Sequence, residues 1–576
     1  MPFNLKELIV SVTCRSKESR IQPQALFLCF LVANALKCWL AYISCDSSGT
    51  DLFLLLNYLE SFLLALLVYG GLAAAGRASL LFVFYLVQGL YLAINVCYLN
   101  LFNSPLHLNY YYQLWWEFFS ISDKFTALPA LHSLFLALMD LPLLIAVAFR
   151  LRSTPRLFRP TLCRGLFLTV FASLALSLML VFSELSSPVR LKSLSSKPAA
   201  YNAIVLHRYG ILAHNLLDLF TADNEKQELL KLSHGEPISG KGSCAIPPEI
   251  FMIQVESLDA NIIDFNWHGR YVAPFLHQIS RQSLYFPFTM SYHLAGGSSD
   301  CEVSVLNSVE PFSSFPTMTS GRYDYPNSLA RVLGGRGMVT LAFHGNDGNY
   351  YNRDQAYYKM DFDKFYDRLR MGLPEEGWGA SDQRLFEFAE KKIAQLRRPF
   401  LCYLITMSSH EPFRNVENYF NDSAYDDVEP EITRHYFKSI SYVDQVLREF
   451  VSHVRANYPH AYIFIYGDHT PYVIKKGLYQ RAAFMMDDKE FEFVPLLIVT
   501  PSKQVRMEQK LAVSFLDIAP TVLAASGVPY RFRTTGENLL EKPLIRPIPF
   551  REDSYDRALL YREAQKTRKN LFLDER

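Results

Sequence analysis

Five apolar segments in the first 185 residues constrain the fold of this chain more than any other feature. Each has about the 20 residues that a helix needs to cross the hydrocarbon core of a bilayer. Hydrophobic residues make up 50% of the chain and charged residues only 20%, a balance that indicates that part of the chain lies in lipid. The sequence therefore predicts an α-helical membrane domain over residues 1–185, with five transmembrane helices at residues 24–44, 53–75, 79–102, 130–149 and 165–183.

Positively charged residues in the short loops predict the orientation of these spans. Four of them precede the first span, and five arginines lie in the loop of residues 150–164, between the fourth and fifth spans. The loop between the first two spans, residues 45–52, contains neither lysine nor arginine. We therefore expect the N-terminus to be cytoplasmic and the chain beyond residue 185 to lie outside the membrane.

The rest of the chain is expected to form a linker with an amphipathic helix (186–245), an outer α/β domain (246–560) and a charged tail (561–576). In the outer domain, apolar runs alternate with amphipathic stretches, as is typical of a doubly wound α/β sheet. The net charge of +1 gives no support for a nucleic-acid partner, and the nine cysteines contain no C-x-x-C pair. The predicted strands are 250–255, 338–343, 400–406, 461–466 and 494–500.

Chemically capable side chains follow the first four of these strands. In open α/β sheets ligands gather at the carboxyl ends of the strands, so four such endings predict one site. A carboxylate beside an imidazole suits a divalent cation, and Gly467 before the pair is expected to allow a sharp backbone turn. Taken singly, each side chain has a plain structural alternative, such as a turn aspartate or a structural histidine. The residues are Glu256, His344, His410 and the Asp468–His469 pair.

Two further segments supply candidates. Ser299 and Glu302 have the spacing of a capping box, which predicts that a helix begins there. Ser298, just ahead, is either a plain turn serine or a nucleophile, because a helix N-terminus and a metal ion would both favour its ionised hydroxyl. Arg353, in a loop rich in glycine and asparagine, is a candidate for binding phosphate or sulfate through two hydrogen bonds. The alternative is a surface ion pair with Asp354.

The ordered set of motifs across residues 246–525 resembles the sulfatase-like branch of the alkaline phosphatase superfamily, most closely the lipoteichoic acid synthase type. The five-span anchor and the linker helix are similar to that family as well. The matching stretches are Val255-Glu-Ser257, Gly297-Ser-Ser-Asp-Cys-Glu302, Phe343-His-Gly-Asn346, Tyr351-Asn-Arg-Asp354, Phe362-Asp-Lys-Phe-Tyr366, Trp378-Gly-Ala-Ser-Asp382, Ser409-His-Glu-Pro-Phe413, Tyr466-Gly-Asp-His469 and Leu516-Asp-Ile-Ala-Pro-Thr521.

The resemblance implies a role for each candidate residue. One divalent metal ion, typically manganese in this family with zinc or magnesium as alternatives, would be held by Glu256, Ser298, Asp468 and His469. Ser298 stands where the family has its threonine nucleophile. The phosphate and headgroup would be held by His344, Arg353 and His410, with His410 or His344 as general acid. Tyr351 and Asn346 stand where the family has Trp and Asp, so they leave the choice of headgroup open.

These implications predict a membrane-anchored, metal-dependent transferase on the outer side of the bacterial cytoplasmic (inner) membrane. It would move a phosphoglycerol headgroup from a membrane phospholipid, phosphatidylglycerol above all, through a covalent Ser298 intermediate to a glycan or glycolipid acceptor. The alternatives are a phosphoethanolamine transferase, a hydrolase of the sulfatase or phosphodiesterase type and a non-enzymatic membrane regulator. The Cys/Ser-x-Pro-x-Arg pattern of formylglycine sulfatases is absent around Ser298.

Overall fold

The chain divides into two compact units, which we describe separately. The first comprises residues 1–106, 125–196 and 200–218, and the second comprises residues 107–124, 197–199 and 219–576. The tail prediction, the span at 165–183 and residues 186–234 of the predicted linker fall outside the described residues. The rest of the predicted linker, residues 235–245, is described and contains the strand Glu236–Lys241, which pairs with residues 529–534 of the second unit. The computed structural model describes residues 23–45, 62–63, 65–73, 78–102, 135–153, 235–291, 297–311, 316–319, 321, 323–396, 399–471, 484–486, 489–491, 493–507 and 513–541.

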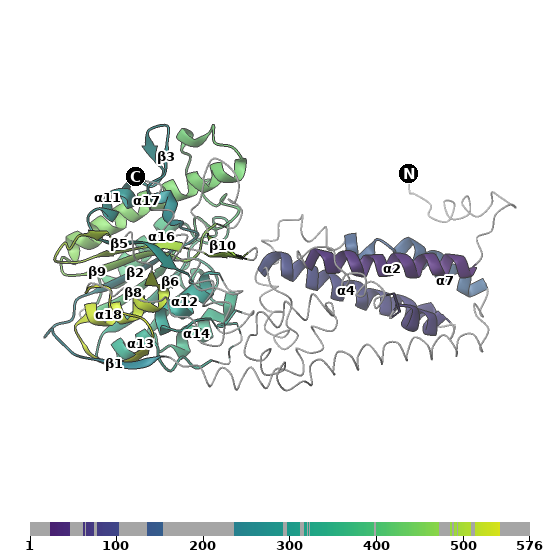
Figure 1. Ribbon diagram of the computed structural model, residues 1–576, viewed down its shortest axis with the longest axis horizontal. Coiled ribbons are helices and arrows are strands. Elements are labelled where there is room, and N and C mark those ends of the chain that lie inside the picture. Colours follow the sequence, from purple (N-terminus) through teal and green to yellow (C-terminus); the bar gives the residue numbers. More distant parts are fainter. Residues whose placement is uncertain are drawn as a thin grey trace. The chain divides into compact units, whose positions relative to one another are not determined.

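The first unit contains two helices that are long and apolar enough to cross a membrane (Figure 1). They are α2 (Pro23–Cys45) and α4 (Ala78–Phe102), and they coincide with two of the predicted spans. The described part of the 130–149 span is the shorter apolar helical segment Phe135–Phe149, which leads into α7 (Leu141–Ser153). Five transmembrane helices are therefore not confirmed by the described part of the chain.

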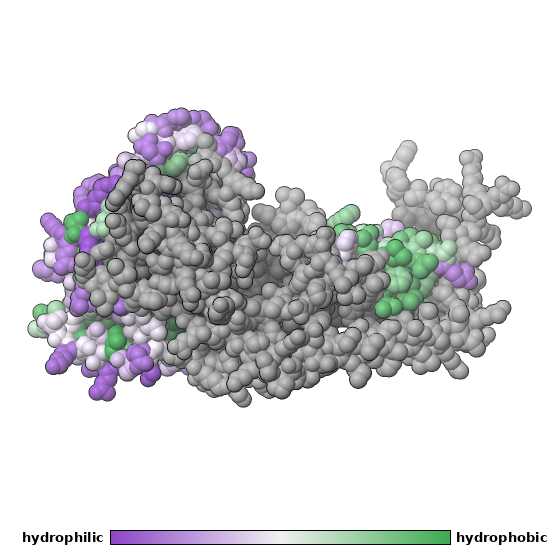
Figure 2. Space-filling view, viewed as in Figure 1, coloured by the Kyte–Doolittle hydropathy of each residue, from purple (hydrophilic) through white to green (hydrophobic). Residues whose placement is uncertain are grey.

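The outer surface of these helices is hydrophobic, as Figure 2 shows. Monomeric soluble proteins rarely expose large apolar side chains in a continuous patch of this kind. Here they are exposed, whereas the part of the second unit that is coloured in Figure 2 is mostly hydrophilic. The exposed residues are Leu28, Val32, Leu36, Leu80, Val83, Leu86, Val87, Leu90, Phe135, Ile145 and Phe149.

A buried ion pair lies inside the first unit. It involves the helical segment Phe135–Phe149, which is interrupted before Leu141 because Pro142 has no N–H group to bond the preceding turn. Asp140, at the interruption, accepts hydrogen bonds from Lys37 Nζ at 2.9 Å and from the Tyr85 hydroxyl at 2.6 Å. The same two groups donate to the carbonyl oxygen of Ala137, at 3.4 and 3.2 Å. The Lys37 and Asp140 side chains are both 0% exposed.

Polar side chains complete this network. Asn34 Nδ2 donates to the other carboxylate oxygen of Asp140 at 2.8 Å. The amides of Asn34 and Gln88 bond each other at 2.9 and 3.0 Å, and the Tyr69 hydroxyl donates to Gln88 Oε1 at 2.7 Å. Side chains from four helical segments of the first unit therefore meet in one polar centre within an otherwise apolar interior.

A nine-stranded mixed sheet organises the second unit, in the order β13-β5-β12-β9-β2-β8-β6-β7 with β14 also paired to β5. The strands β9, β2, β8, β6 and β7 run parallel, whereas β12 is antiparallel to both of its neighbours. Its strands are β2 (Ile250–Val255), β5 (Leu284–Met290), β6 (Val339–His344), β7 (Lys364–Tyr366), β8 (Phe400–Ile405), β9 (Tyr462–Gly467), β12 (Phe493–Val499), β13 (Arg506–Met507) and β14 (Val513–Ser514).

The five predicted strands are present, with boundaries that differ by at most one residue. Every residue of β2 and β8 is buried, which explains their continuous apolar runs, because a central parallel strand is covered on both faces. The prediction of a doubly wound sheet omits the antiparallel part formed by β5 and β12. Pro287 lies inside β5, and a proline argues against a strand in a sequence.

Helices cover both faces of this sheet, as Figure 1 shows. One core lies between the sheet and α12, α13, α14 and α18, and the other between the sheet and α11, α16 and α17. The helices are α11 (Pro274–Ser280), α12 (Ser298–Asn307), α13 (Leu329–Gly334), α14 (Arg353–Lys359), α15 (Arg368–Met371), α16 (Asp382–Ile393), α17 (Glu431–Asn457) and α18 (Ile518–Ser526).

Smaller elements complete the unit. Three two-stranded antiparallel sheets are formed by β1 (Glu236–Lys241) with β15 (Pro529–Thr534), by β3 (Asn266–Trp267) with β4 (Arg270–Tyr271), and by β10 (Phe484–Met486) with β11 (Lys489–Phe491). The 3-10 helices are η2 (Ala260–Ile263), η3 (Tyr350–Asn352), η4 (Ser423–Tyr425) and η5 (Phe515–Asp517). Because β9, β2, β8 and β6 are parallel and adjacent, their carboxyl ends meet at one edge of the main sheet.

Candidate active site

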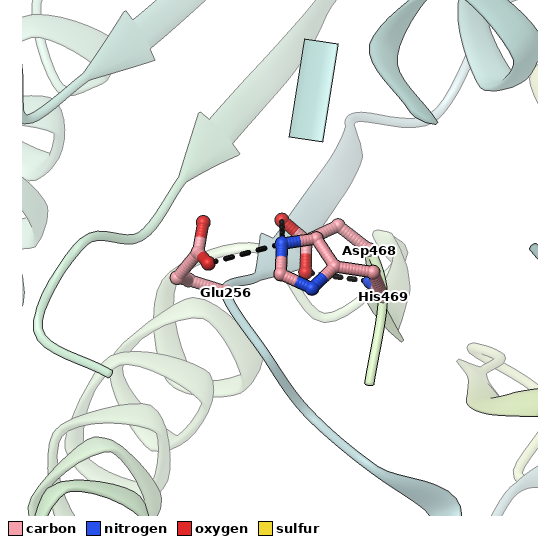
Figure 3. Close-up of side chains that lie close together, drawn as sticks. All are labelled: Glu256, Asp468 and His469. Atoms are coloured by element: carbon pink, nitrogen blue, oxygen red, sulfur yellow. Dashed lines mark hydrogen bonds and ion pairs between the residues drawn. The ribbon is translucent and has the colours of Figure 1, made fainter. Parts of the chain in front are cut away.

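Glu256, Asp468 and His469 form a compact buried cluster at this edge (Figure 3). Glu256 follows β2 directly, and Asp468 follows Gly467, the last residue of β9. The two strands are parallel neighbours in which Val255 pairs with Gly467, so their ends bring the three side chains together. One ligand atom from each of the three residues lies within 4.8 Å of the other two.

Close packing explains the glycine in this motif. A Cβ atom added to Gly467 would lie 2.2 Å from the carbonyl oxygen of Leu258. The φ angle of Gly467 lies outside the left-handed region. The chain bends at residues 468 and 469, directly after this glycine, and the absent side chain of Gly467 lets the segment after β2 approach the end of β9.

Hydrogen-bond acceptors face one another in the cluster. His469 Nδ1 lies 3.1 Å from the carbonyl oxygen of Thr470. Because a carbonyl oxygen can only accept, this contact places the proton on Nδ1 and a lone pair on Nε2 of the neutral ring. Nε2 lies 3.2 Å from Glu256 Oε1 and 3.8 Å from Asp468 Oδ2. A positive charge is needed among these atoms. Without a metal ion, a second proton on His469 would supply it and would be donated from Nε2 to Glu256; with the neutral ring, the donor set fits a divalent metal ion.

The two carboxyl groups of the cluster differ in their affinity for protons. Burial and then the charge of Glu256 raise the pKa of Asp468 above its ordinary value. Burial alone would also raise the pKa of Glu256, but the charge of His469 and the hydrogen bond that its protonated ring donates outweigh burial, and the pKa of Glu256 is lowered. Without a metal ion, Asp468 is therefore the group that tends to hold a proton.

Ser298 joins the cluster from the N-terminus of α12. Its hydroxyl donates a hydrogen bond to Glu256 Oε2 at 2.9 Å. The helix follows Gly297, whose φ of 43° and ψ of −114° are rarely adopted by residues with a side chain. The hydroxyl thus lies at the positive end of the helix dipole and beside a candidate metal ligand.

Glu302 and Arg353 form a buried ion pair, with 2.6 Å between Glu302 Oε1 and Arg353 Nη2. The predicted capping box of Ser299 and Glu302 is wrong, because α12 has no side-chain cap and Glu302 turns inward to bind Arg353. The alternative of a surface pair between Arg353 and Asp354 is also wrong, because Asp354 pairs with Arg370. Burial opposes the charge of Arg353, but Glu302 outweighs this effect and raises the pKa of its guanidinium.

Three further candidates lie on β6 and the loop after it, with β8 between β6 and β2. His344 is the last residue of β6 and is buried. Asn346 is also buried, and its Oδ1 accepts a hydrogen bond from the backbone of Asp347 at 2.8 Å. Tyr351 has a φ of 57°, and its ring centroid lies 5.1 Å from the Cζ atom of Arg353.

His410 follows β8 and is partly exposed. Its Nδ1 lies 2.8 Å from the carbonyl oxygen of Glu411, which places the proton on Nδ1 and leaves Nε2 as the acceptor in the neutral ring. The ring packs against Trp378 with 4.7 Å between the centroids. His410 also contributes to the lowered pKa of Glu256, so the two groups are close enough to interact electrostatically.

The loop after β8 contains positioning residues that sequence reasoning missed. Thr406 Oγ1 accepts a hydrogen bond from the backbone N–H of Glu256 at 2.9 Å, and Ser409 Oγ donates to its carbonyl oxygen at 2.6 Å. The buried carboxylate of Asp382 accepts from the backbone N–H of Met407 at 2.7 Å. Ser409 and Asp382 lie in motifs of the family resemblance, and this was the only signal available for them.

Comparisons with known proteins agree with this architecture. The Sulfatase family model matches residues 248–528. Lipoteichoic acid synthase 2 of Bacillus subtilis (strain 168) is 26% identical over 347 residues, covering 58% of this chain and 53% of the relative. The chain thus spans about half the length of the first curated relatives it matches. Lipoteichoic acid synthase of Staphylococcus aureus (strain NCTC 8325 / PS 47) is 24% identical over 593 residues, covering 94% of this chain and 88% of the relative.

A solved structure shares the fold over most of the chain. The integral membrane protein lipooligosaccharide phosphoethanolamine transferase A from Neisseria meningitidis superposes with a TM-score of 0.55 at 14% identity. The match covers 89% of this chain and 96% of that structure. Together with the family model and the sheet-edge cluster, these findings show that the chain carries, over residues 248–528, a sulfatase domain of the alkaline phosphatase superfamily.

Proposed function

We propose that the protein is a membrane-anchored, metal-dependent phosphotransferase. It takes a phosphoglycerol headgroup from phosphatidylglycerol through a covalent ester on Ser298 and passes it to a glycan or glycolipid hydroxyl. The observation that carries this proposal is the cluster of facing acceptors, in which the Ser298 hydroxyl lies 2.9 Å from Glu256 and the His469 lone pair lies 3.2 Å from the same carboxylate. The names of the relatives support a transferase of this class.

The metal site consists of Glu256, Asp468, His469 and Ser298. Manganese is favoured, because hard carboxylate and hydroxyl oxygens with one imidazole suit it, and zinc or magnesium are alternatives. A divalent ion bound there would neutralise the two carboxylates and favour the ionised form of the serine hydroxyl. A complete set of ligands, of which Glu256, Asp468 and His469 are buried, also disfavours a non-enzymatic regulator.

The protein's own groups account for the two transfer steps. Ser298 Oγ forms a bond to phosphorus as the bond to the diacylglycerol oxygen breaks, and Arg353 binds the phosphoryl oxygens. His410, or alternatively His344, gives a proton to the leaving oxygen and, once neutral, takes one from the acceptor hydroxyl. In this second step the acceptor oxygen forms a bond to phosphorus as the bond between Ser298 Oγ and phosphorus breaks. His344 is proposed to contact the phosphate, and Tyr351 and Asn346 the headgroup.

The anchor fits a lipid donor. The exposed apolar residues of α2 and α4 suit a lipid environment, and we propose that they are two of five spans in the bacterial cytoplasmic membrane, with the N-terminus inside and the sulfatase domain outside. Anchoring in the membrane that holds the donor raises the donor's effective concentration at the active site.

Mass spectrometry of the full-length protein in detergent tests the proposal. After incubation with Mn2+ and phosphatidylglycerol, we expect a phosphoglycerol adduct on the peptide that contains Ser298. The adduct should be lost in Ser298→Ala and retained in Ser299→Ala, which removes the neighbouring hydroxyl. If a phosphoethanolamine adduct forms, and only from phosphatidylethanolamine, the proposed donor is wrong and phosphatidylethanolamine replaces it. If water is the only acceptor, the protein is a hydrolase. If the protein binds no divalent metal, the proposal that it is an enzyme is refuted.

A further inference from the structure

Glu302 is a buried carboxylate that the two transfer steps do not use. It lies one helical turn after Ser298 on α12, and its side chain is 0% exposed. Arg353 donates to it from Nε at 3.0 Å and from Nη2 at 2.6 Å, and the Tyr357 hydroxyl donates to its other oxygen at 2.7 Å. Glu302 therefore ties the helix of the proposed nucleophile to α14, which begins with Arg353.

These contacts fix the orientation of the Arg353 guanidinium. Glu302 takes up the edge formed by Nε and Nη2, and Nη1 donates to the carbonyl oxygen of Tyr350 at 3.3 Å. A guanidinium has five N–H groups in a fixed plane. The bonds to Glu302 and Tyr350 use three of them, and the remaining two belong to Nη1 and Nη2. The Tyr351 ring lies over the guanidinium, 5.1 Å from Cζ, and limits its rotation.

A purely structural role does not explain this arrangement well. A buried ion pair adds little to stability compared with apolar residues of the same size, because both charges lose their hydration. Here the pair also holds a cation whose outer edge, Nη1 and Nη2, suits two parallel hydrogen bonds to phosphoryl oxygens. Its partner carboxylate lies on the same helix as Ser298, four residues away.

We propose that Glu302 is a positioning residue that holds Arg353 with its outer edge toward the phosphoryl group at Ser298. This inference rests on the proposed function, because it requires that Arg353 binds phosphoryl oxygens. Glu302 keeps the buried guanidinium charged and oriented before substrate arrives, so little rearrangement is needed on binding. Tyr357 holds the second carboxylate oxygen and so keeps Glu302 itself in place.

A double-mutant cycle tests the inference, with inorganic phosphate as the probe. Calorimetric titration measures phosphate affinity of the full-length, Mn2+-loaded protein in detergent, for wild type, Glu302→Gln, Arg353→Gln and the double variant. We expect each single variant to bind phosphate about tenfold more weakly or worse, since charge-assisted hydrogen bonds are lost or misdirected. The double variant should be no weaker than Arg353→Gln alone, and Mn2+ affinity should stay unchanged throughout.

The control is Asp354→Asn. Asp354 follows Arg353 on α14, and the substitution breaks its more exposed pair with Arg370 of α15, so phosphate affinity should be unchanged. Wild-type phosphate affinity in Glu302→Gln would overturn the inference alone. Additive losses in the double variant would overturn it too, because they would show that Glu302 and Arg353 act independently. If wild type binds Mn2+ but not phosphate, or if Arg353→Gln binds phosphate normally, the proposed role of Arg353 fails and the inference fails with it.

Discussion

Replacing Asp468 by asparagine should stabilise the metal-free protein. Asp468 Oδ1 accepts hydrogen bonds from the backbone N–H groups of Ser257 and His469, at 2.8 and 2.7 Å. An asparagine oxygen can accept both. The atom that changes is Oδ2, which lies 3.8 Å from His469 Nε2 and belongs to the cluster of acceptors. The substitution therefore removes one negative charge from the cluster while it keeps the local backbone contacts.

The magnitude follows from the geometry. Two carboxylate oxygens within 4.8 Å of each other repel by about 3 kcal/mol at an effective dielectric constant of about 20. Because the pKa of Asp468 is raised, its folded form holds a proton that the unfolded form releases near pH ~4. The metal-free wild type should thus lose stability as the pH rises from ~4 through the raised pKa. Asp468→Asn should lack this loss.

Thermal unfolding of the full-length protein in detergent, with EDTA, measures the effect. At pH 8 the variant should melt several degrees above wild type, because about 1 kcal/mol shifts the melting temperature by about 2–4 °C in domains of this class. At pH 5 the two should differ little. Adding Mn2+ should reverse the order, since only wild type keeps the full ligand set. A variant less stable than wild type in EDTA at pH 8, with the same pH dependence, would refute the reasoning.

Three other changes give clear expectations. Ser298→Thr should retain the phosphoglycerol adduct in mass spectrometry, because the hydroxyl is kept; loss of the adduct would show that the extra methyl group does not fit. Asp140→Ala should lower the free energy of unfolding of the first unit by about 3–5 kcal/mol, because Lys37 loses its counter-ion; replacing both residues by leucine should cost less, and equal losses would contradict a charge effect. Gly467→Ala should lower the melting temperature and weaken Mn2+ binding, measured by titration. The reason is that the added Cβ would lie 2.2 Å from the carbonyl oxygen of Leu258. A variant with the wild-type melting temperature and Mn2+ affinity would show that the backbone moves at little cost in energy.

Sequence patterns predicted the central strands and the meeting point of Glu256 with Asp468, because parallel buried strands are continuous apolar runs whose ends share an edge. They did not predict β5, since Pro287 interrupts its pattern. The orientation of the Glu302 side chain could not be predicted from the sequence for a different reason. Local spacing matched a helix cap, but its true partner, Arg353, is 51 residues away in the chain, and only tertiary packing brings the two together.

The buried pair in the first unit has a consequence for how the protein is made. Lys37 is translated long before Asp140, because 103 residues separate them. A lysine near the middle of a lone membrane helix costs about 2.5–3.5 kcal/mol to insert, and only the arrival of the later segment offsets that cost. If α2 spans the bilayer, its stable insertion should therefore occur only after the ribosome has passed residue 140. Nascent chains that stop earlier should be poorly retained in the membrane or removed by quality control.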